Sequence, residues 1–209
     1  MKFDPEFKRA VSELPTQEKD KLLFRLLKRD KILADRLYFQ LLSGDSIQDR
    51  RLIVEKKIKK DLAKISSSTY SHAHLLREMK SLSAVITEHV KVTKDKYGEA
   101  SLNLLMLNEA LRKKGNDTRK VKQLEVYKFG IYVISRAFKI LILINALHED
   151  FLVEFEDGLK ELSELIGDNP SLMHIAMHNG LDINWLYRAE IPDDIVAIHK
   201  NLRDKGFLR

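Results

Sequence analysis

An uninterrupted helical pattern over residues 118–147 constrains the fold of this chain more than any other feature. A helix of that length would measure about 45 Å, at about 1.5 Å per residue. Its residues 140–144 are five consecutive aliphatic side chains, which leave no polar face for a full turn. They would also fit a buried strand, but no turn residues flank them and no partner strand is visible. A helix that is apolar on every side must be surrounded by other helices, so we predict a buried central helix.

The composition also favours helices. Only eight glycines and four prolines occur in 209 residues, which leaves few tight turns for the hairpins of a β-sheet. Apolar residues recur at helical spacing outside the central pattern, for example at Val54, Ile58 and Leu62. We therefore expect an all-α protein, a multi-helix bundle of about eight to ten helices around one long buried central helix.

Capping residues mark the starts of the N-terminal helices. Asp4 precedes a proline and predicts a short first helix, and a second is expected after Pro15. A third is expected from about Lys31 to Gly44, where glycine favours a helix end. The second and third helices resemble a helical hairpin. Ser46 then begins a further helix that is expected to continue to about residue 65.

Three further helices are predicted after residue 70, in addition to the central helix. A helix is expected to start near Ser71 and to end at Gly98, because glycine commonly follows the last turn. The next helix is expected over residues 101–114. Beyond the central helix, an amphipathic helix is expected over residues 151–166.

The chain is expected to form a single helical domain over residues 1–209. Residues 66–69, Ser-Ser-Ser-Thr, are its most linker-like stretch, because short hydroxyl side chains favour caps and turns over helix interiors. A subdivision of the domain would fall there, between N-terminal helices in residues 1–66 and a main bundle in residues 70–209.

The chain contains no cysteine, which excludes a disulfide, a thiolate nucleophile and a cysteine-based zinc site. This favours a reducing compartment. The first seven residues are mixed and charged, unlike a signal peptide. The most apolar window, residues 131–147, contains Arg136 and Lys139 and is shorter than a membrane span. We therefore expect a cytoplasmic protein that does not enter a membrane.

Three stretches carry a resemblance to a known family. They are residues 14–23 (LPTQEKDKLL), 88–99 (EHVKVTKDKYGE) and 179–186 (NGLDINWL), and the likeness extends to residues 206–209 (GFLR). The chain resembles an uncharacterised family of all-helical bacterial proteins, some of which carry a deoxyuridine triphosphate nucleotidohydrolase label. The resemblance implies a helical fold, and the label implies hydrolysis of a nucleotide.

The carboxylates of residues 154–164 only partly match the pattern that such an activity needs. Helical nucleotide pyrophosphohydrolases hold Mg²⁺ between a Glu-x-x-Glu helix and a facing Glu-x-x-Asp helix. Here Glu154 and Asp157 form one such pair, and Glu161 and Glu164 form the other, but both lie on one predicted helix. These four residues would be the metal ligands, and Mg²⁺ the cofactor, only if the chain has this activity; otherwise we expect no metal and no cofactor. The interpretation that the spacing favours is an acidic stripe that faces solvent or a partner.

Charge is unevenly distributed along the chain, although the formal net charge is +6. Residues 46–66 carry seven basic against three acidic side chains, and residues 112–128 carry seven against two. Residues 149–168 carry one against eight. Basic helix faces of this kind suit phosphate or nucleic-acid binding, and a solvated face predicts the same pattern. The candidate residues are Arg50, Lys56, Lys57, Lys60, Lys64, Arg112, Lys113, Lys114, Arg119, Lys120 and Lys122.

No phosphate-binding loop, nucleophile elbow or dinucleotide fingerprint occurs in the sequence. We therefore expect a non-enzymatic cytoplasmic interaction protein that binds a protein or a nucleic acid through its basic helix faces. It would be able to form a homo-oligomer through the acidic stripe. The alternative is a metal-dependent pyrophosphohydrolase that acts on nucleotides resembling dUTP. A scaffold with an apolar interface is a third hypothesis, because exposed and buried apolar faces have the same periodicity.

Overall fold

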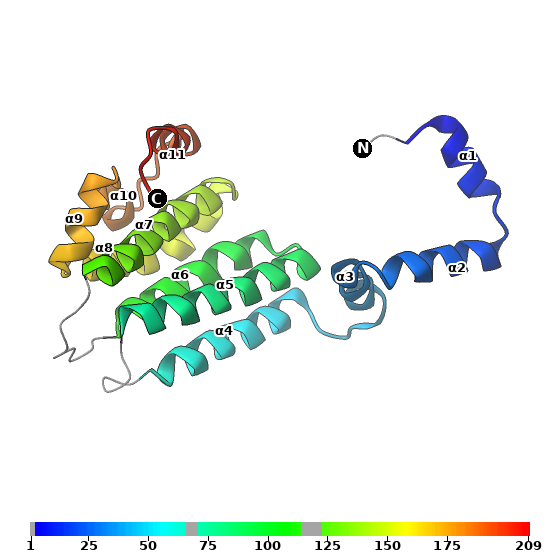
Figure 1. The fold of residues 1–209 in the computed structure, drawn as a ribbon, viewed down its shortest axis with the longest axis horizontal. Helices are drawn as coiled ribbons and strands as arrows, with labels where there is room; N and C mark the ends of the chain where they lie inside the picture. The colour runs from blue at the N-terminus through cyan, green and yellow to red at the C-terminus, as the bar shows by residue number, and fades with distance from the viewer. Residues whose placement is uncertain (1–2, 66–70, 114–122) are drawn as a thin grey trace.

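The computed structural model describes residues 3–65, 71–113 and 123–209. Over these ranges the chain forms eleven α-helices and one 3-10 segment, and no strand (Figure 1). The all-α, multi-helix bundle expected from the sequence is confirmed.

The helices are numbered along the chain. The first three are α1 (Pro5–Glu13), α2 (Thr16–Leu27) and α3 (Lys31–Leu42). The next four are α4 (Ile47–Ala63), α5 (His72–Thr93), α6 (Lys96–Leu111) and α7 (Gln123–Asn145). The last part contains the 3-10 segment η1 (Glu149–Phe155), α8 (Glu156–Gly167), α9 (Pro170–His178), α10 (Ile183–Tyr187) and α11 (Ile195–Asp204).

The central helix of the bundle is α7, which packs against α5, α6, α9 and α11. In its aliphatic run, Ile140, Leu141 and Ile144 are buried, whereas Ile142 and Leu143 are only half-buried. The expectation that this run is enclosed on every side is therefore wrong at two residues. Both line a cavity between α7 and α11.

The hydrophobic core extends from α7 to α4. Val54, Ile58 and Leu62 are buried as their spacing predicted, and α4 packs against α5 and α6. Ser46 begins α4 with a reciprocal capping box, in which its hydroxyl accepts from the Asp49 amide and the Asp49 carboxylate accepts from the Ser46 amide. The helices that precede and follow residues 66–70 thus share one core.

The junction of α5 and α6 differs from the sequence expectation. The helix α5 ends at Thr93, and Lys94 takes a left-handed conformation with φ of 62°. Asp95 then caps α6 by accepting a hydrogen bond of 2.7 Å from the Gly98 amide. Gly98 therefore lies in the first turn of α6, and the expectation that it ends the preceding helix is wrong.

The expected α-helix over residues 151–166 is wrong in its first part. The chain forms the 3-10 segment η1 there, and α8 begins only at Glu156. Two aromatic contacts hold η1 against α6, because the ring centroids of Phe151 and Phe155 lie 5.5 and 5.3 Å from that of Tyr97. A 3-10 segment has about three residues per turn, so its acidic side chains do not continue the helical line of α8.

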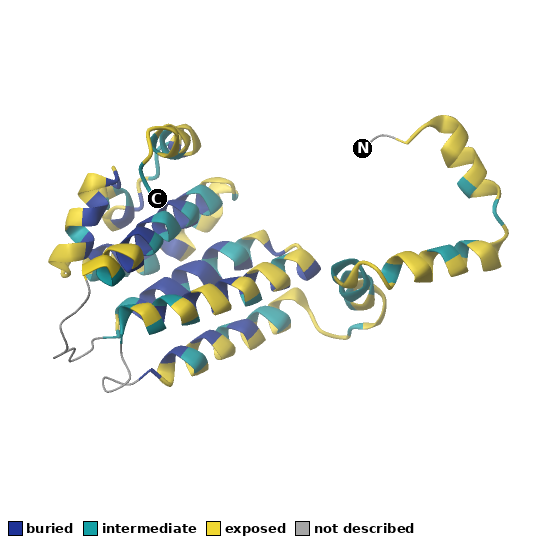
Figure 2. Cartoon of the chain, viewed as in Figure 1, coloured by how far each residue is buried: buried dark blue, intermediate teal, exposed yellow. Residues whose placement is uncertain are grey.

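The first three helices form an arm that projects from the rest of the molecule (Figure 1). We call residues 3–42 the N-terminal arm, and the described residues from 46 onward the body. No residue of the arm is buried (Figure 2). The expected hairpin of the second and third helices is not found, because α3 packs against α5 of the body while α2 extends away from it.

The C-terminal elements close one end of the bundle. Trp185 of α10 packs against Phe138 of α7, with ring centroids 6.4 Å apart, and this contact holds the C-terminal tail on the core. Gly180 and Gly206 follow α9 and α11 with positive φ angles of 72° and 89°. Within the described ranges, no helix has both the length and the apolar character needed to cross a bilayer.

Candidate functional site

The N-terminal arm carries apolar side chains at helical spacing that contact no core. Leu41 and Leu42 are the most exposed, at 75% and 73% of their surface. Phe3 and Phe7 stack on each other, with ring centroids 5.5 Å apart. The large exposed apolar residues of the arm are Phe3, Phe7, Leu23, Phe24, Leu26, Tyr38, Leu41 and Leu42. Exposed apolar surface of this extent marks an interaction surface.

Two contacts fix the base of the arm. The Arg36 guanidinium of α3 donates from Nε and Nη2 to the Lys91 carbonyl, at 3.0 and 2.8 Å. This carbonyl lies in the last turn of α5, where the helix dipole favours a cation. The guanidinium of Arg50 in α4 lies over the Phe39 ring of α3, at 5.0 Å from its centroid. Both contacts are made by α3 and leave α1 and α2 free of the body.

A groove of about 390 Å³ lies where α3 meets α4 and α5. Tyr38 and Ile53 form part of its wall, and both are more than 60% exposed. Charged side chains of both signs also line it, including Asp35, Arg50 and Glu88. The exposed apolar surface therefore continues from the arm onto the first helix of the body.

The predicted basic face of α4 is partly neutralised. Lys57 and Lys64 donate to the Asp61 carboxylate at 2.8 and 2.7 Å, and these bonds lower the pKa of Asp61 to about 2. Lys56 and Lys60 are exposed and have no carboxylate within 4 Å among the residues that the structure describes. Leu52 and Ile53 are exposed on the same helix, so its surface is mixed rather than uniformly basic.

The second predicted basic cluster is described only at its start. Arg112 is bound by two carboxylates, with Nη1 at 2.7 Å from Glu109 and Nη2 at 2.6 Å from Glu161. These partners raise the pKa of Arg112, first through the Glu161 hydrogen bonds. Lys113 is half-buried. The remaining candidates, Lys114, Arg119, Lys120 and Lys122, lie outside the described residues.

The candidate metal ligands are not gathered into one site. Glu161 is occupied by Arg112 and by the Asn108 side chain, and Glu154 accepts the Tyr97 hydroxyl at 2.7 Å. Asp157 and Glu164 are exposed on α8. Where the structure describes the chain, no three histidine or carboxylate side chains form a group that could hold a metal ion.

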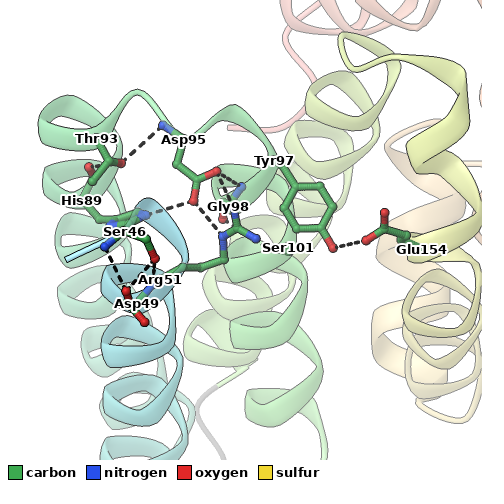
Figure 3. A network of polar contacts seen from close by, with 10 residues as sticks. All are labelled: Ser46, Asp49, Arg51, His89, Thr93, Asp95, Tyr97, Gly98, Ser101 and Glu154. Atoms are coloured by element: carbon green, nitrogen blue, oxygen red, sulfur yellow. Dashed lines mark hydrogen bonds and ion pairs between the residues drawn. The ribbon is translucent and has the colours of Figure 1, made fainter. Parts of the chain in front are cut away.

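The most densely bonded polar group of the body is centred on Asp95 (Figure 3). Its Oδ2 accepts from Arg51 Nε at 2.7 Å and lies 3.2 Å from His89 Nε2, while Oδ1 accepts from Arg51 Nη2 at 2.9 Å and from the Gly98 amide. Burial alone would raise the pKa of Asp95, but the bonds from His89, Arg51 and Gly98 outweigh it and hold the pKa well below its usual range.

This Asp95 network is a structural junction of α4, α5 and α6. Both carboxylate oxygens are already occupied, so Asp95 has little capacity left to bind a metal or act as a base. Arg51 also lies over the Tyr97 ring, at 4.6 Å from its centroid. Burial and the hydrogen bond to Glu154 raise the pKa of Tyr97 to about 12, which keeps its hydroxyl a donor.

Gly98 is required by the same junction. A Cβ atom at this position would lie 2.0 Å from Oδ2 of Asp95 and 3.0 Å from Nε of Arg51. The pair of Arg51 and Asp95 could not be identified from the sequence, because 44 positions separate the two residues. The Asp-x-x-Gly spacing, a cap followed by a residue without a side chain, was the signal that could have located one half of it.

The fold and its surfaces define an all-α bundle with a projecting amphipathic arm. No protein-family model, curated protein or solved structure matches this chain significantly.

Proposed function

We propose that the protein is a non-enzymatic, cytoplasmic interaction protein that binds a partner protein through the apolar surface of its N-terminal arm. The observation that carries this proposal is the absence of any buried residue in residues 3–42, although all three helices there carry large apolar side chains. Full burial of a leucine or phenylalanine side chain contributes about 1.5–3 kcal/mol, so several such residues supply a strong driving force for association.

A protein partner fits this surface better than a nucleic acid does. Nucleic-acid binding draws its affinity mainly from contacts of basic side chains with phosphates. Two of the four candidate lysines of α4 already bind Asp61, and Arg112 binds two glutamates. The unpaired Lys56 and Lys60 lie on the helix that carries exposed Leu52 and Ile53, and we assign them a steering role toward an acidic rim of the partner.

No contact among the described residues favours the metal-dependent hydrolase that the sequence raised as an alternative. Glu154 and Glu161 are engaged by Tyr97 and Arg112, so two of the four candidate ligands have other roles. The interaction function is therefore the one we propose.

The test compares two neighbouring charge additions on α3. Three tagged proteins are purified from the native cells: the unchanged chain, Leu41→Glu and the control Gln40→Glu. The proteins recovered with each are identified. Their binding to each variant is then measured again with purified components. Leu41 and Gln40 are both exposed, so neither change should unfold the body. We expect one partner to be retained by Gln40→Glu, and its affinity to fall by about tenfold or more in Leu41→Glu. Equal affinity for both variants would contradict the proposal.

Binding to RNA and duplex DNA, measured across a salt series, distinguishes the nucleic-acid hypothesis from the proposed protein interaction. A steep salt dependence that is lost when Lys56 and Lys60 become glutamate, and kept in Leu41→Glu, would place the interface on the basic face instead. Sedimentation of the purified chain measures its oligomeric state and tests a third possibility. A homo-oligomer that Leu41→Glu dissociates would identify the partner as a second copy of this chain.

A further inference from the structure

A cavity of about 640 Å³ lies between α7, α11 and the C-terminal segment. Its size falls within the roughly 300–1,000 Å³ range of small-molecule sites. Arg136 and Lys139 of α7 line it together with His199 and Arg203 of α11. Cationic or titratable side chains thus come from both helices, and no carboxylate is part of the lining.

The Arg136 guanidinium is held rigidly by neutral partners. Its Nη1 donates to Asn103 Oδ1 at 3.1 Å and its Nη2 to Ser83 Oγ at 2.5 Å, and both partners are buried. One face lies over the Tyr132 ring, at 5.1 Å from the centroid. A guanidinium has five N–H donors, so three remain for a ligand. Within the described chain no carboxylate lies within 4 Å of Arg136, and its charge is not neutralised.

The other basic groups differ in their partners. Lys139 forms an ion pair of 2.7 Å with Glu99, which offsets its charge. Arg203 is exposed and has no carboxylate within 4 Å among the described residues. Burial, and then the charge of Arg203, lower the pKa of His199, so the surroundings of this imidazole are already positive. The cavity therefore contains two guanidinium groups, one from each wall, that have no counter-ion among the residues that the structure describes.

The remaining wall is apolar. Ile142 and Leu143 are the two residues of the aliphatic run of α7 that the core leaves half-buried, and both line the cavity. Leu208 lines it from the C-terminal segment. Guanidinium groups bind phosphate and carboxylate in a two-pronged geometry, and an aliphatic wall beside them suits a hydrocarbon or aromatic group.

We propose that this cavity binds a small organic oxyanion, a phosphate or carboxylate carried on an apolar body. Arg136 and Arg203 bind the oxyanion, and Ile142 and Leu143 contact the apolar body. Arg136 is the preorganised anchor, because Ser83 and Asn103 fix its guanidinium before the ligand arrives. This proposal is independent of the interaction function of the arm.

The test is calorimetric titration of the full chain with phenyl phosphate, phenylacetate and inorganic phosphate. We expect saturable binding of at least one of the two aromatic anions, about tenfold or more tighter than that of inorganic phosphate, because only the aromatic anions use the apolar wall. Phenyl phosphate and phenylacetate distinguish the two oxyanions. Absence of saturable binding of both aromatic anions at millimolar concentration would overturn the proposal.

Two exposed residues of α11 provide matched variants. Arg203→Gln removes a lining charge, whereas Lys200→Gln removes the same charge from a position outside the cavity. We expect Arg203→Gln to weaken binding about tenfold and Lys200→Gln to change it less than about twofold. Equal losses would indicate general electrostatic attraction and contradict the site. A readout at the site itself is the imidazole resonance of His199, which should shift on binding in the wild type and in Lys200→Gln.

Discussion

The helices of the N-terminal arm and of the body begin from similar sequence patterns, but they differ in whether their apolar residues are buried. Helix α3 of the arm and helix α4 of the body are both capped and rich in leucine or isoleucine. In α4 the apolar positions are buried against α5 and α6, whereas in the arm not one residue is buried. The comparison shows that helical periodicity specifies a face that must be covered, and that tertiary contacts decide whether this chain covers it.

The largest contrast is expected between two aspartates that each cap a helix. Asp95→Ala leaves the Arg51 guanidinium, His89 and the Gly98 amide without their common acceptor, and should lower the free energy of unfolding of the body by about 3–5 kcal/mol. Asp4→Ala removes the exposed cap of α1 and should change it by less than about 0.5 kcal/mol. Urea unfolding followed by fluorescence of Trp185, the only tryptophan, reports on the body alone. A similar loss in both variants would show that the arm unfolds together with the body.

A pair of leucines gives the next largest contrast. Leu107 of α6 is fully buried, and its replacement by alanine should lower the free energy of unfolding by about 2–4 kcal/mol through lost contacts and a cavity. Leu41 of the arm is 75% exposed, and its replacement by alanine should have almost no effect on the same unfolding curve. The order of the two effects should reverse in a partner-binding assay. There Leu41→Ala should bind the partner more weakly than Leu107→Ala does. Destabilisation by Leu41→Ala in the isolated chain would mean that the Leu41 side chain itself packs on the body.

A smaller effect is expected from acid. The pKa of Asp95 lies below its ordinary value of 3.8 in the folded protein, so the unfolded chain binds more protons between the two values. The stability that this carboxylate contributes is therefore fully present above about pH 4 and is lost as the pH falls through this range. Urea midpoints measured by Trp185 fluorescence from pH 7 downward should fall more steeply in the wild type than in Asp95→Asn. If the urea midpoints of both proteins fall equally steeply with pH, Asp95 does not contribute to the acid sensitivity of the body.

Periodicity and capping were enough to predict the helices but not all of their ends. The cap at Ser46 and the buried positions Val54, Ile58 and Leu62 follow directly from the sequence. Gly98 was misplaced because glycine usually follows a helix, whereas here the Asp95 carboxylate occupies the space of a missing side chain. The 3-10 segment η1 was missed because Phe151 and Phe155 are held by Tyr97, a contact between distant residues.

The candidate surfaces were less predictable for a related reason. The pairing of Lys57 and Lys64 with Asp61 follows from their spacing on a helix and could have been found in the sequence. The bonds of Arg112 to Glu161 and of Arg51 to Asp95 depend on the fold and could not. The half-buried positions of Ile142 and Leu143 on the central helix could not be predicted either, because the burial of an aliphatic residue depends on what packs above it.

The junction between arm and body has a consequence for engineering. The capping box of Ser46 and Asp49 starts α4 with groups that belong to α4 itself, so this helix does not need the arm in order to begin. Gly44 lies just before it in open space, with no atom within 4 Å of a Cβ built there. The arm is therefore a replaceable part: another helical segment joined at this glycine would redirect the body to a new target, and would forfeit the packing of α3 on α5 together with the contacts of Arg36 and Phe39.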